Sequence, residues 1–168
     1  MKHIFLTGPK QVGKSTVIQK VITMLVDDGL SPLSVHGFMT FWDSKDASGL
    51  YIADAGRKGE PRLLGIRRDN GIELVPRAFD DHGAQLLTDA PGARIILMDE
   101  LGFLEGESLH FQEAVFACLD GDVPILGVLR EGDVPWHAPI KTHPGVSVYL
   151  VSQANRDALP AIIASSIL

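Results

Sequence analysis

Near the start of the chain, four residues have the spacing of a phosphate-binding loop. Gly8, Gly13, Lys14 and Ser15 match the pattern GxxxxGK[ST] within TGPKQVGKST, residues 7–16. In such a loop, backbone N–H groups and the start of the following helix bind a polyphosphate, the lysine reaches its β and γ phosphates, and the Ser15 hydroxyl is a ligand for Mg²⁺. The pattern therefore predicts a bound nucleoside triphosphate (ATP, GTP or others), with Mg²⁺ as cofactor.

The whole loop enters the predicted nucleotide site. Its members are Gly8, Pro9, Lys10, Gln11, Val12, Gly13, Lys14, Ser15 and Thr16. Lys10 and Gln11 stand in the middle, where small residues are common. Lys10 could place a charge over the phosphates, but a solvated lysine at the loop tip is the interpretation that we favour.

Two acids follow a buried apolar run farther along the chain. RIILMDE, residues 94–100, has the form of a strand whose C-terminal end presents Asp99 to the magnesium ion. Glu100 comes next, where a carboxylate can orient an attacking water or accept its proton. We therefore predict Lys14 and Glu100 as catalytic residues, and Ser15 and Asp99 as metal ligands.

Other polar residues follow later apolar runs. Asn155 could hydrogen-bond the nucleotide base and Arg156 could stack on it; a helix cap and a surface arginine are the alternative. Arg130 ends the run VPILGVLR, where it could contact the γ phosphate. The positive charges within residues 57–68 could neutralise charge in a transition state, although a solvated hairpin is the interpretation that we favour. These charges are Arg57, Lys58, Arg62, Arg67 and Arg68.

The hydrophobic periodicity indicates alternating strands and helices around these residues. Strands are expected at 3–7, 31–41, 94–100, 123–130 and 146–152, and helices at 14–28, 80–90, 108–119 and after 157. Residues 43–77 lack a helical period and predict inserted β-hairpins. Because several strands are too apolar to face water, we expect a single α/β domain over residues 1–168, with a mostly parallel sheet and helices on both faces.

Composition narrows the classes of partner. The chain has 168 residues, of which 45% are hydrophobic, and a net charge of −6, so we expect no nucleic-acid partner. A single cysteine, Cys118, excludes an internal disulfide. The apolar first strand runs directly into the glycine loop, and no apolar run approaches the roughly 20 residues of a membrane span. We therefore expect a cytoplasmic protein with no membrane association, and its oligomeric state stays open.

Several motifs in sequence order resemble one family over nearly the whole chain. TGPKQVGKST, HGFMT, ILMDELGFLE, ILGVLR and VSQANRDALP are together similar to the small nucleoside-triphosphatases first recognised in thermophiles, which also have a human member. The resemblance implies a RecA-like P-loop fold and Mg²⁺-dependent hydrolysis of nucleoside triphosphates to diphosphates, with broad base tolerance. It also aligns Glu105 with a later glutamate of the family. The family often has glycine at position 11, and residues 41–54, FWDSKDASGLYIAD, depart from its glutamate- and arginine-containing hairpin.

Three functions stay open from the residues. A self-contained triphosphatase is favoured by the pair Asp99 and Glu100, which can direct water at the γ phosphate. A small-molecule or nucleoside kinase is the alternative, with Asp43 as the acceptor-binding acid and the charges of residues 57–68 as a lid. The third is a nucleotide-dependent switch or adaptor in which slow hydrolysis serves a partner.

Overall fold

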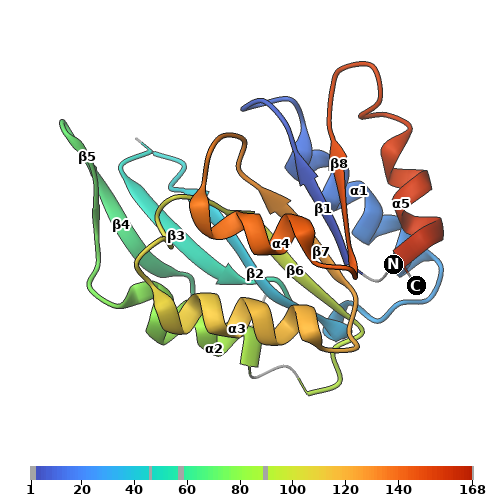
Figure 1. The fold of residues 1–168 in the computed structure, drawn as a ribbon, viewed down its shortest axis with the longest axis horizontal. Coiled ribbons are helices and arrows are strands. Elements are labelled where there is room, and N and C mark those ends of the chain that lie inside the picture. The colour runs from blue at the N-terminus through green and yellow to red at the C-terminus, as the bar shows by residue number, and fades with distance from the viewer. Residues whose placement is uncertain (1–2, 46, 57–58, 89–90, 168) are drawn as a thin grey trace.

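A computed structural model describes residues 3–45, 47–56, 59–88 and 91–167, which form one eight-stranded sheet (Figure 1). The strands are β1 (His3–Thr7), β2 (Val35–Trp42), β3 (Gly49–Asp54), β4 (Arg62–Arg68), β5 (Gly71–Leu74), β6 (Ile95–Leu101), β7 (Ile125–Leu129) and β8 (Val146–Leu150). Their order across the sheet is β5-β4-β3-β2-β6-β7-β1-β8. The first strand in sequence therefore lies between β7 and the edge strand β8.

The sheet has a parallel part and an antiparallel part. From β2 through β6, β7 and β1 to β8, each neighbouring pair is parallel. The strands β3, β4 and β5 are added beside β2 as antiparallel neighbours. These three strands occupy the region where hairpins were predicted, and the predicted mostly parallel α/β fold is confirmed. Because β4 runs in the same direction as β2, its C-terminal end reaches the edge where the parallel strands end.

Helices cover both faces of the sheet (Figure 1). They are α1 (Lys14–Asp27), α2 (Ala84–Thr88), α3 (Leu109–Asp120), α4 (Ala138–Thr142) and α5 (Leu159–Ile167). Side chains alternate along β1, so that Ile4 and Leu6 belong to the core with α1 and α5. Phe5, fully buried between them in sequence, belongs to the core with α2, α3 and α4. No helix in the described part of the chain is long and apolar enough to span a membrane.

The main differences from the predicted elements are short helical segments. The expected helix at 80–90 is a π-helical turn, Phe79–Gly83, followed by α2, and residues 89–90 lie outside the described residues. A 3₁₀ turn, Pro32–Ser34, delays the start of β2 to Val35. Sequence periodicity missed the turn Pro135–His137 and α4 because neither is long enough to repeat a helical pattern.

Candidate active site

The glycine loop joins β1 to α1 and has a backbone that its glycines permit. Gly8 has a φ of 139° and Gly13 a φ of 111°, both in the region that favours glycine. A Cβ atom on Gly8 would lie 2.6 Å from the carbonyl oxygen of Val151, so the loop packs closely beside the end of β8. Gln11 also has a positive φ, 63°. The backbone there has the conformation that a glycine, common at this position in the family, would adopt without strain.

Lys14 lies over the inside of this loop. Its side chain is 9% exposed, and its Nζ donates to the carbonyl oxygens of Gly8 at 2.6 Å and Pro9 at 2.9 Å. A lysine ammonium needs hydrogen-bond acceptors when it is buried, and the loop carbonyls supply them. The ammonium is therefore held at the concave side of the loop, where the predicted phosphates would bind.

The two predicted metal ligands are close together. The Oγ atom of Ser15, at the start of α1, lies 3.5 Å from Oδ1 of Asp99 on β6. Burial raises the pKa of Asp99 to about 6, and the negative charge of Glu100 adds to this effect, whereas the Ser15 hydroxyl and the Lys14 ammonium oppose it. A hydroxyl and a carboxylate are hard oxygen ligands of the kind that Mg²⁺ prefers. These two residues thus fit the predicted magnesium site.

Thr40 on β2 braces the two acids from the neighbouring strand. Its Oγ1 donates to the carbonyl oxygen of Asp99 at 3.3 Å and accepts from the N–H of Glu100 at 3.4 Å. The peptide bond between these acids is cis, and the pairing with β7 shifts register across the same stretch. Sequence reasoning missed this role. The only signal was the position of Thr40 at the end of HGFMT.

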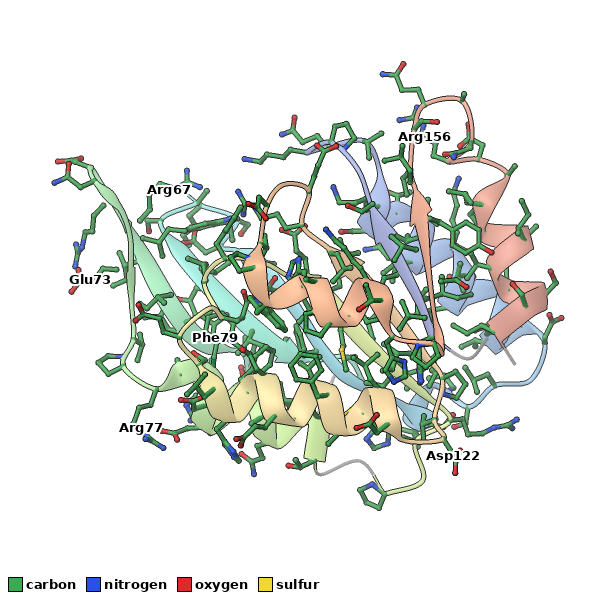
Figure 2. All side chains as sticks on the ribbon, in the orientation of Figure 1. Arg67, Glu73, Arg77, Phe79, Asp122 and Arg156 are labelled. Carbon is green, nitrogen blue, oxygen red and sulfur yellow. The ribbon has the colours of Figure 1, made fainter. Side chains whose placement is uncertain are left out.

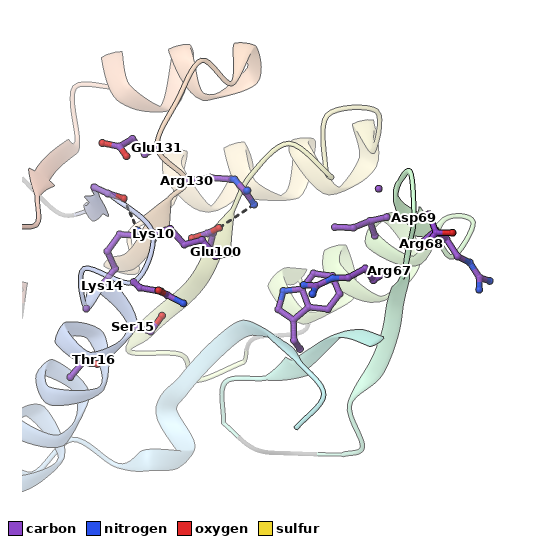
Figure 3. Close-up of a pocket in the computed structure, with 16 residues that line it drawn as sticks. Lys10, Lys14, Ser15, Thr16, Arg67, Arg68, Asp69, Glu100, Arg130 and Glu131 are labelled. Atoms are coloured by element: carbon purple, nitrogen blue, oxygen red, sulfur yellow. Dashed lines mark hydrogen bonds and ion pairs between the residues drawn. The ribbon is translucent and has the colours of Figure 1, made fainter. Parts of the chain in front are cut away.

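Glu100 and Arg130 approach each other at the ends of β6 and β7. Arg130 Nη1 lies 3.9 Å from Glu100 Oε1, and both side chains line the pocket shown in Figure 3. The guanidinium also lies over the ring of Phe103, with its Cζ atom 5.3 Å from the centroid. A half-exposed ion pair of this kind contributes little to stability. Its consequence is local: a cation stands beside the predicted catalytic carboxylate.

Glu105 lies behind these residues in the loop after β6. Its side chain is 3% exposed and accepts from the backbone N–H of Gly102 at 3.0 Å. Burial raises its pKa to about 7, although the backbone hydrogen bonds that it accepts oppose the rise. The indole of Trp136 fixes the same glycine, donating from Nε1 to its carbonyl oxygen at 2.8 Å. Glu105 therefore holds the loop that follows the acids and does not line the pocket.

A pocket of about 840 Å³ joins these residues to the antiparallel part of the sheet. On one side it is lined by Gly8, Lys10, Gln11, Gly13, Lys14, Ser15 and Thr16. Figure 3 shows Arg67, Arg68 and Asp69, from the end of β4 and its turn, across from Lys14 and Ser15. Trp42, Gly71, Ile72 and Glu131 also line it. Three residues predicted for the phosphate and metal sites do not line the pocket: Pro9, Val12 and Asp99. Asp99 is nevertheless in contact with Ser15, which does line it.

The predicted base-binding residues lie beside the loop, outside this lining. The side-chain amide of Asn155 forms two hydrogen bonds with the backbone. Its Oδ1 accepts from the N–H of Ser152, and its Nδ2 donates to the carbonyl oxygen of Leu150, each at 2.8 Å. Arg156 Nη1 lies 3.4 Å from the carbonyl oxygen of Val12. The Asn155 side chain thus braces the turn after β8, and Arg156 stands next to the glycine loop. Their contact with a base stays a prediction.

The residues proposed for a kinase are only partly brought together. Asp43 accepts hydrogen bonds from the N–H groups of Lys45 and Gly49, so it braces the turn between β2 and β3 and does not line the pocket. Of the basic cluster, Arg67 and Arg68 line the pocket, whereas Arg57 and Lys58 lie outside the described residues. Sequence reasoning did not single out Asp69, Ile72 or Glu131.

The architecture defines the class of protein first. A strand that is followed by a GxxxxGK[ST] loop and a helix, within a parallel sheet, is the P-loop motif, which is typical of a large class of α/β proteins. The chain belongs to the NTPase family, whose model matches residues 3–164. This confirms the family that the motifs predicted.

Individual relatives cover nearly the whole chain. The chain is 31% identical to nucleoside-triphosphatase THEP1 of Methanosarcina barkeri, over 98% of this chain and 97% of the relative. It is 32% identical to the cancer-related nucleoside-triphosphatase homolog of Bos taurus, over 96% and 95%. The solution structure of a human cancer-related nucleoside triphosphatase has the same fold, with a TM-score of 0.80 at 24% identity over 99% of this chain and 97% of that one.

Proposed function

We propose that this chain is a Mg²⁺-dependent nucleoside triphosphatase that releases the γ phosphate to water. The observation that carries the proposal is that Glu100 and Lys14 line one pocket with the glycine loop. A carboxylate and a loop-bound ammonium on the same cavity supply a base for water and a cation for the phosphates. The names of the relatives, nucleoside-triphosphatases in archaea and mammals, support the same activity.

Lys14 would bind the phosphates by exchanging partners. Its Nζ now donates to two loop carbonyls, and phosphate oxygens entering the loop are stronger acceptors because they carry charge. The ammonium would then stabilise the negative charge that the γ phosphoryl group spreads over its oxygens in the transition state. Ser15 and Asp99 would hold Mg²⁺, which when bound neutralises charge on the β and γ phosphates.

Glu100 would act on the attacking water. As the water oxygen bonds to the γ phosphorus, the bond between that phosphorus and the bridging oxygen breaks, and its electron pair stays on the nucleoside diphosphate. The proton lost by the water passes to the Glu100 carboxylate and then to the released phosphate. Thr40 holds the peptide group that joins Asp99 to Glu100, so the carboxylate is presented at a fixed point of the sheet edge.

Broad base tolerance fits the residues beside the loop. The Asn155 amide is occupied by backbone bonds at both ends, which leaves it poorly suited to distinguish one base edge from another. Arg156 could stack on any base, because every base presents a π-face. We therefore infer that the phosphates contribute most of the binding energy and the base contributes little discrimination.

Phosphate release tests the proposal directly. Purified protein with Mg²⁺ should release phosphate from ATP, GTP, CTP and UTP without a second substrate, and chelating the metal should stop it. Glu100→Gln should lower turnover by a factor of about 100 or more while leaving triphosphate binding nearly intact. Glu131→Gln is the matched control, since Glu131 lines the same pocket from the loop after β7.

Three results would contradict the proposal. Equal turnover of Glu100→Gln and the wild-type protein would remove Glu100 from catalysis. Release that begins only after a nucleoside or a sugar is added would favour the kinase hypothesis. Lys14→Ala should weaken triphosphate binding, and retained affinity in that variant would exclude the glycine loop as the phosphate site.

A further inference from the structure

The wall of the pocket opposite the glycine loop contains a stacked arginine. Arg67, near the end of β4, has its Cζ atom 4.3 Å from the centroid of the Trp42 ring at the end of β2. Trp42 is partly buried and packs against the core formed with α2 and α3. The indole is therefore a fixed surface, and an arginine that lies on it has a restricted orientation.

Arg67 differs from its neighbour in its partners. Arg68 Nε forms an ion pair with Glu73 Oε2 at 2.6 Å, across the β4–β5 hairpin. Arg67 forms no ion pair with a carboxylate of the described residues, and it lines the pocket (Figure 3). When the face of a guanidinium lies on an aromatic ring, the N–H groups along its edge stay available, because they point outward in the plane of the guanidinium. Those donors match the two oxygens of a phosphate or carboxylate.

This wall lies away from the residues expected to contact the base. Figure 2 shows Arg67 on the antiparallel part of the sheet and Arg156 beyond β8, on the opposite side of the view. A triphosphate held by the loop with its base toward Arg156 would leave the Arg67 wall uncovered. The pocket, about 840 Å³, lies within the roughly 300–1,000 Å³ range of small-ligand sites and extends from the glycine loop to the Arg67 wall.

We propose that Arg67, oriented by Trp42, forms a second anion-binding subsite for the phosphate or carboxylate group of a small molecule that binds beside the triphosphate. Asp69, on the turn after β4, lines the same wall and can accept a hydrogen bond from a hydroxyl of that molecule. The inference rests on the proposed function in two respects, because it takes the triphosphate to be held by the glycine loop and its base to lie toward Arg156. Glu100 and Arg130 line the cavity between the two subsites (Figure 3).

Calorimetric titration of the full chain tests the subsite. The protein is first saturated with Mg²⁺ and the non-hydrolysable analogue β,γ-imido-ATP, and then titrated with inorganic phosphate, AMP, ribose 5-phosphate or citrate, with adenosine as the uncharged control. We expect at least one anion to bind and adenosine not to bind. Arg67→Gln should weaken that binding about tenfold or more. Arg68→Gln, which removes the same charge one residue away, should change it less than about twofold.

Trp42 is a positioning residue in this proposal, so its conservative variant should differ from its truncating one. Trp42→Leu should weaken binding of the anion about threefold, whereas Trp42→Phe, which keeps an aromatic face under the guanidinium, should restore most of that loss. Equal losses in the two variants would show that Trp42 acts only by filling space and would overturn its part of the proposal.

The remaining outcomes separate this inference from the proposed function. If β,γ-imido-ATP itself fails to bind, the glycine loop is not a triphosphate site and the proposed function is wrong. If the analogue binds but no anion follows at millimolar concentration, or if Arg67→Gln and Arg68→Gln weaken the anion equally, the second subsite does not exist. If Arg67→Gln weakens the analogue and not the added anion, Arg67 contacts the triphosphate and the inference is wrong.

Discussion

Glu105 should lower the stability of this protein as the pH rises, and its replacement by glutamine should remove this dependence. Burial raises the pKa of this carboxyl group from 4.5 to about 7 in the folded chain. Below the lower value the group is protonated in both states, so it favours neither. As the pH rises, the unfolded chain loses the proton first, and the folded chain becomes less stable until the folded group ionises too.

The size of the effect follows from the two pKa values. A difference of about 2.5 pH units, at about 1.4 kcal/mol for each, lowers the free energy of unfolding by about 3 kcal/mol in total. Most of this change falls between about pH 5 and pH 8. Glu105→Gln keeps an oxygen that can accept from the N–H of Gly102 but cannot ionise. The free energy of unfolding of this variant should therefore not fall by this amount as the pH rises.

Urea unfolding followed by circular dichroism measures the difference, with a chelator present and nucleotide absent. Other groups titrate in the same range: burial raises the pKa of Asp99 to about 6 and lowers that of His137 to about 4. Because the wild type and the variant both contain these groups, the difference between their pH dependences gives the contribution of Glu105. Glu107→Gln is the control, since Glu107 is exposed two residues away. Parallel pH dependence in wild type and Glu105→Gln would refute the reasoning.

Two further substitutions probe the backbone of the site. Thr40→Val keeps the shape of the side chain but removes both hydrogen bonds to the Asp99–Glu100 peptide, so turnover should fall about tenfold while triphosphate affinity, measured by calorimetry, is retained. Unchanged turnover would show that the acids need no brace from β2. Gly8→Ala brings a Cβ atom within 2.6 Å of Val151 O at a φ of 139°. Thermal unfolding should therefore show a loss of stability of about 2 kcal/mol or more. Triphosphate binding should be lost as well. A variant as stable as the wild type would contradict the close approach of loop and β8.

The sequence was most informative where function depends on neighbouring residues. The glycine loop and the pair Asp99 and Glu100 are continuous motifs, and the strands beside them are apolar enough to be recognised from periodicity alone. The motif did not predict the backbone conformation of Gln11, because only the structure shows that this residue is left-handed. Its φ of 63° lies in the left-handed region, which glycine adopts without strain.

Features that depend on distant pairing were not predictable. Thr40 meets Asp99 only because β2 is the parallel neighbour of β6, which brings together residues 59 positions apart. The contact of Arg67 with Trp42 likewise needs β3 to lie between β2 and β4, with an irregular register at Leu50 and Tyr51. The bonds of the Asn155 amide to the backbone of the turn after β8 were likewise not predictable, and its contact with a base stays a prediction.

The antiparallel addition beside β2 separates two parts of the site that can change independently. The glycine loop and both acids belong to the parallel strands, whereas Arg67, Arg68 and Asp69 belong to a hairpin. Among the described residues, the strands of this hairpin pair only with each other and with β3. Substitutions, insertions or a transplanted hairpin from a relative would alter that wall without disturbing the hydrogen bonds of the parallel sheet. The hairpin is thus the part of the fold through which chains that share one phosphate site could diverge in what they hold beside it.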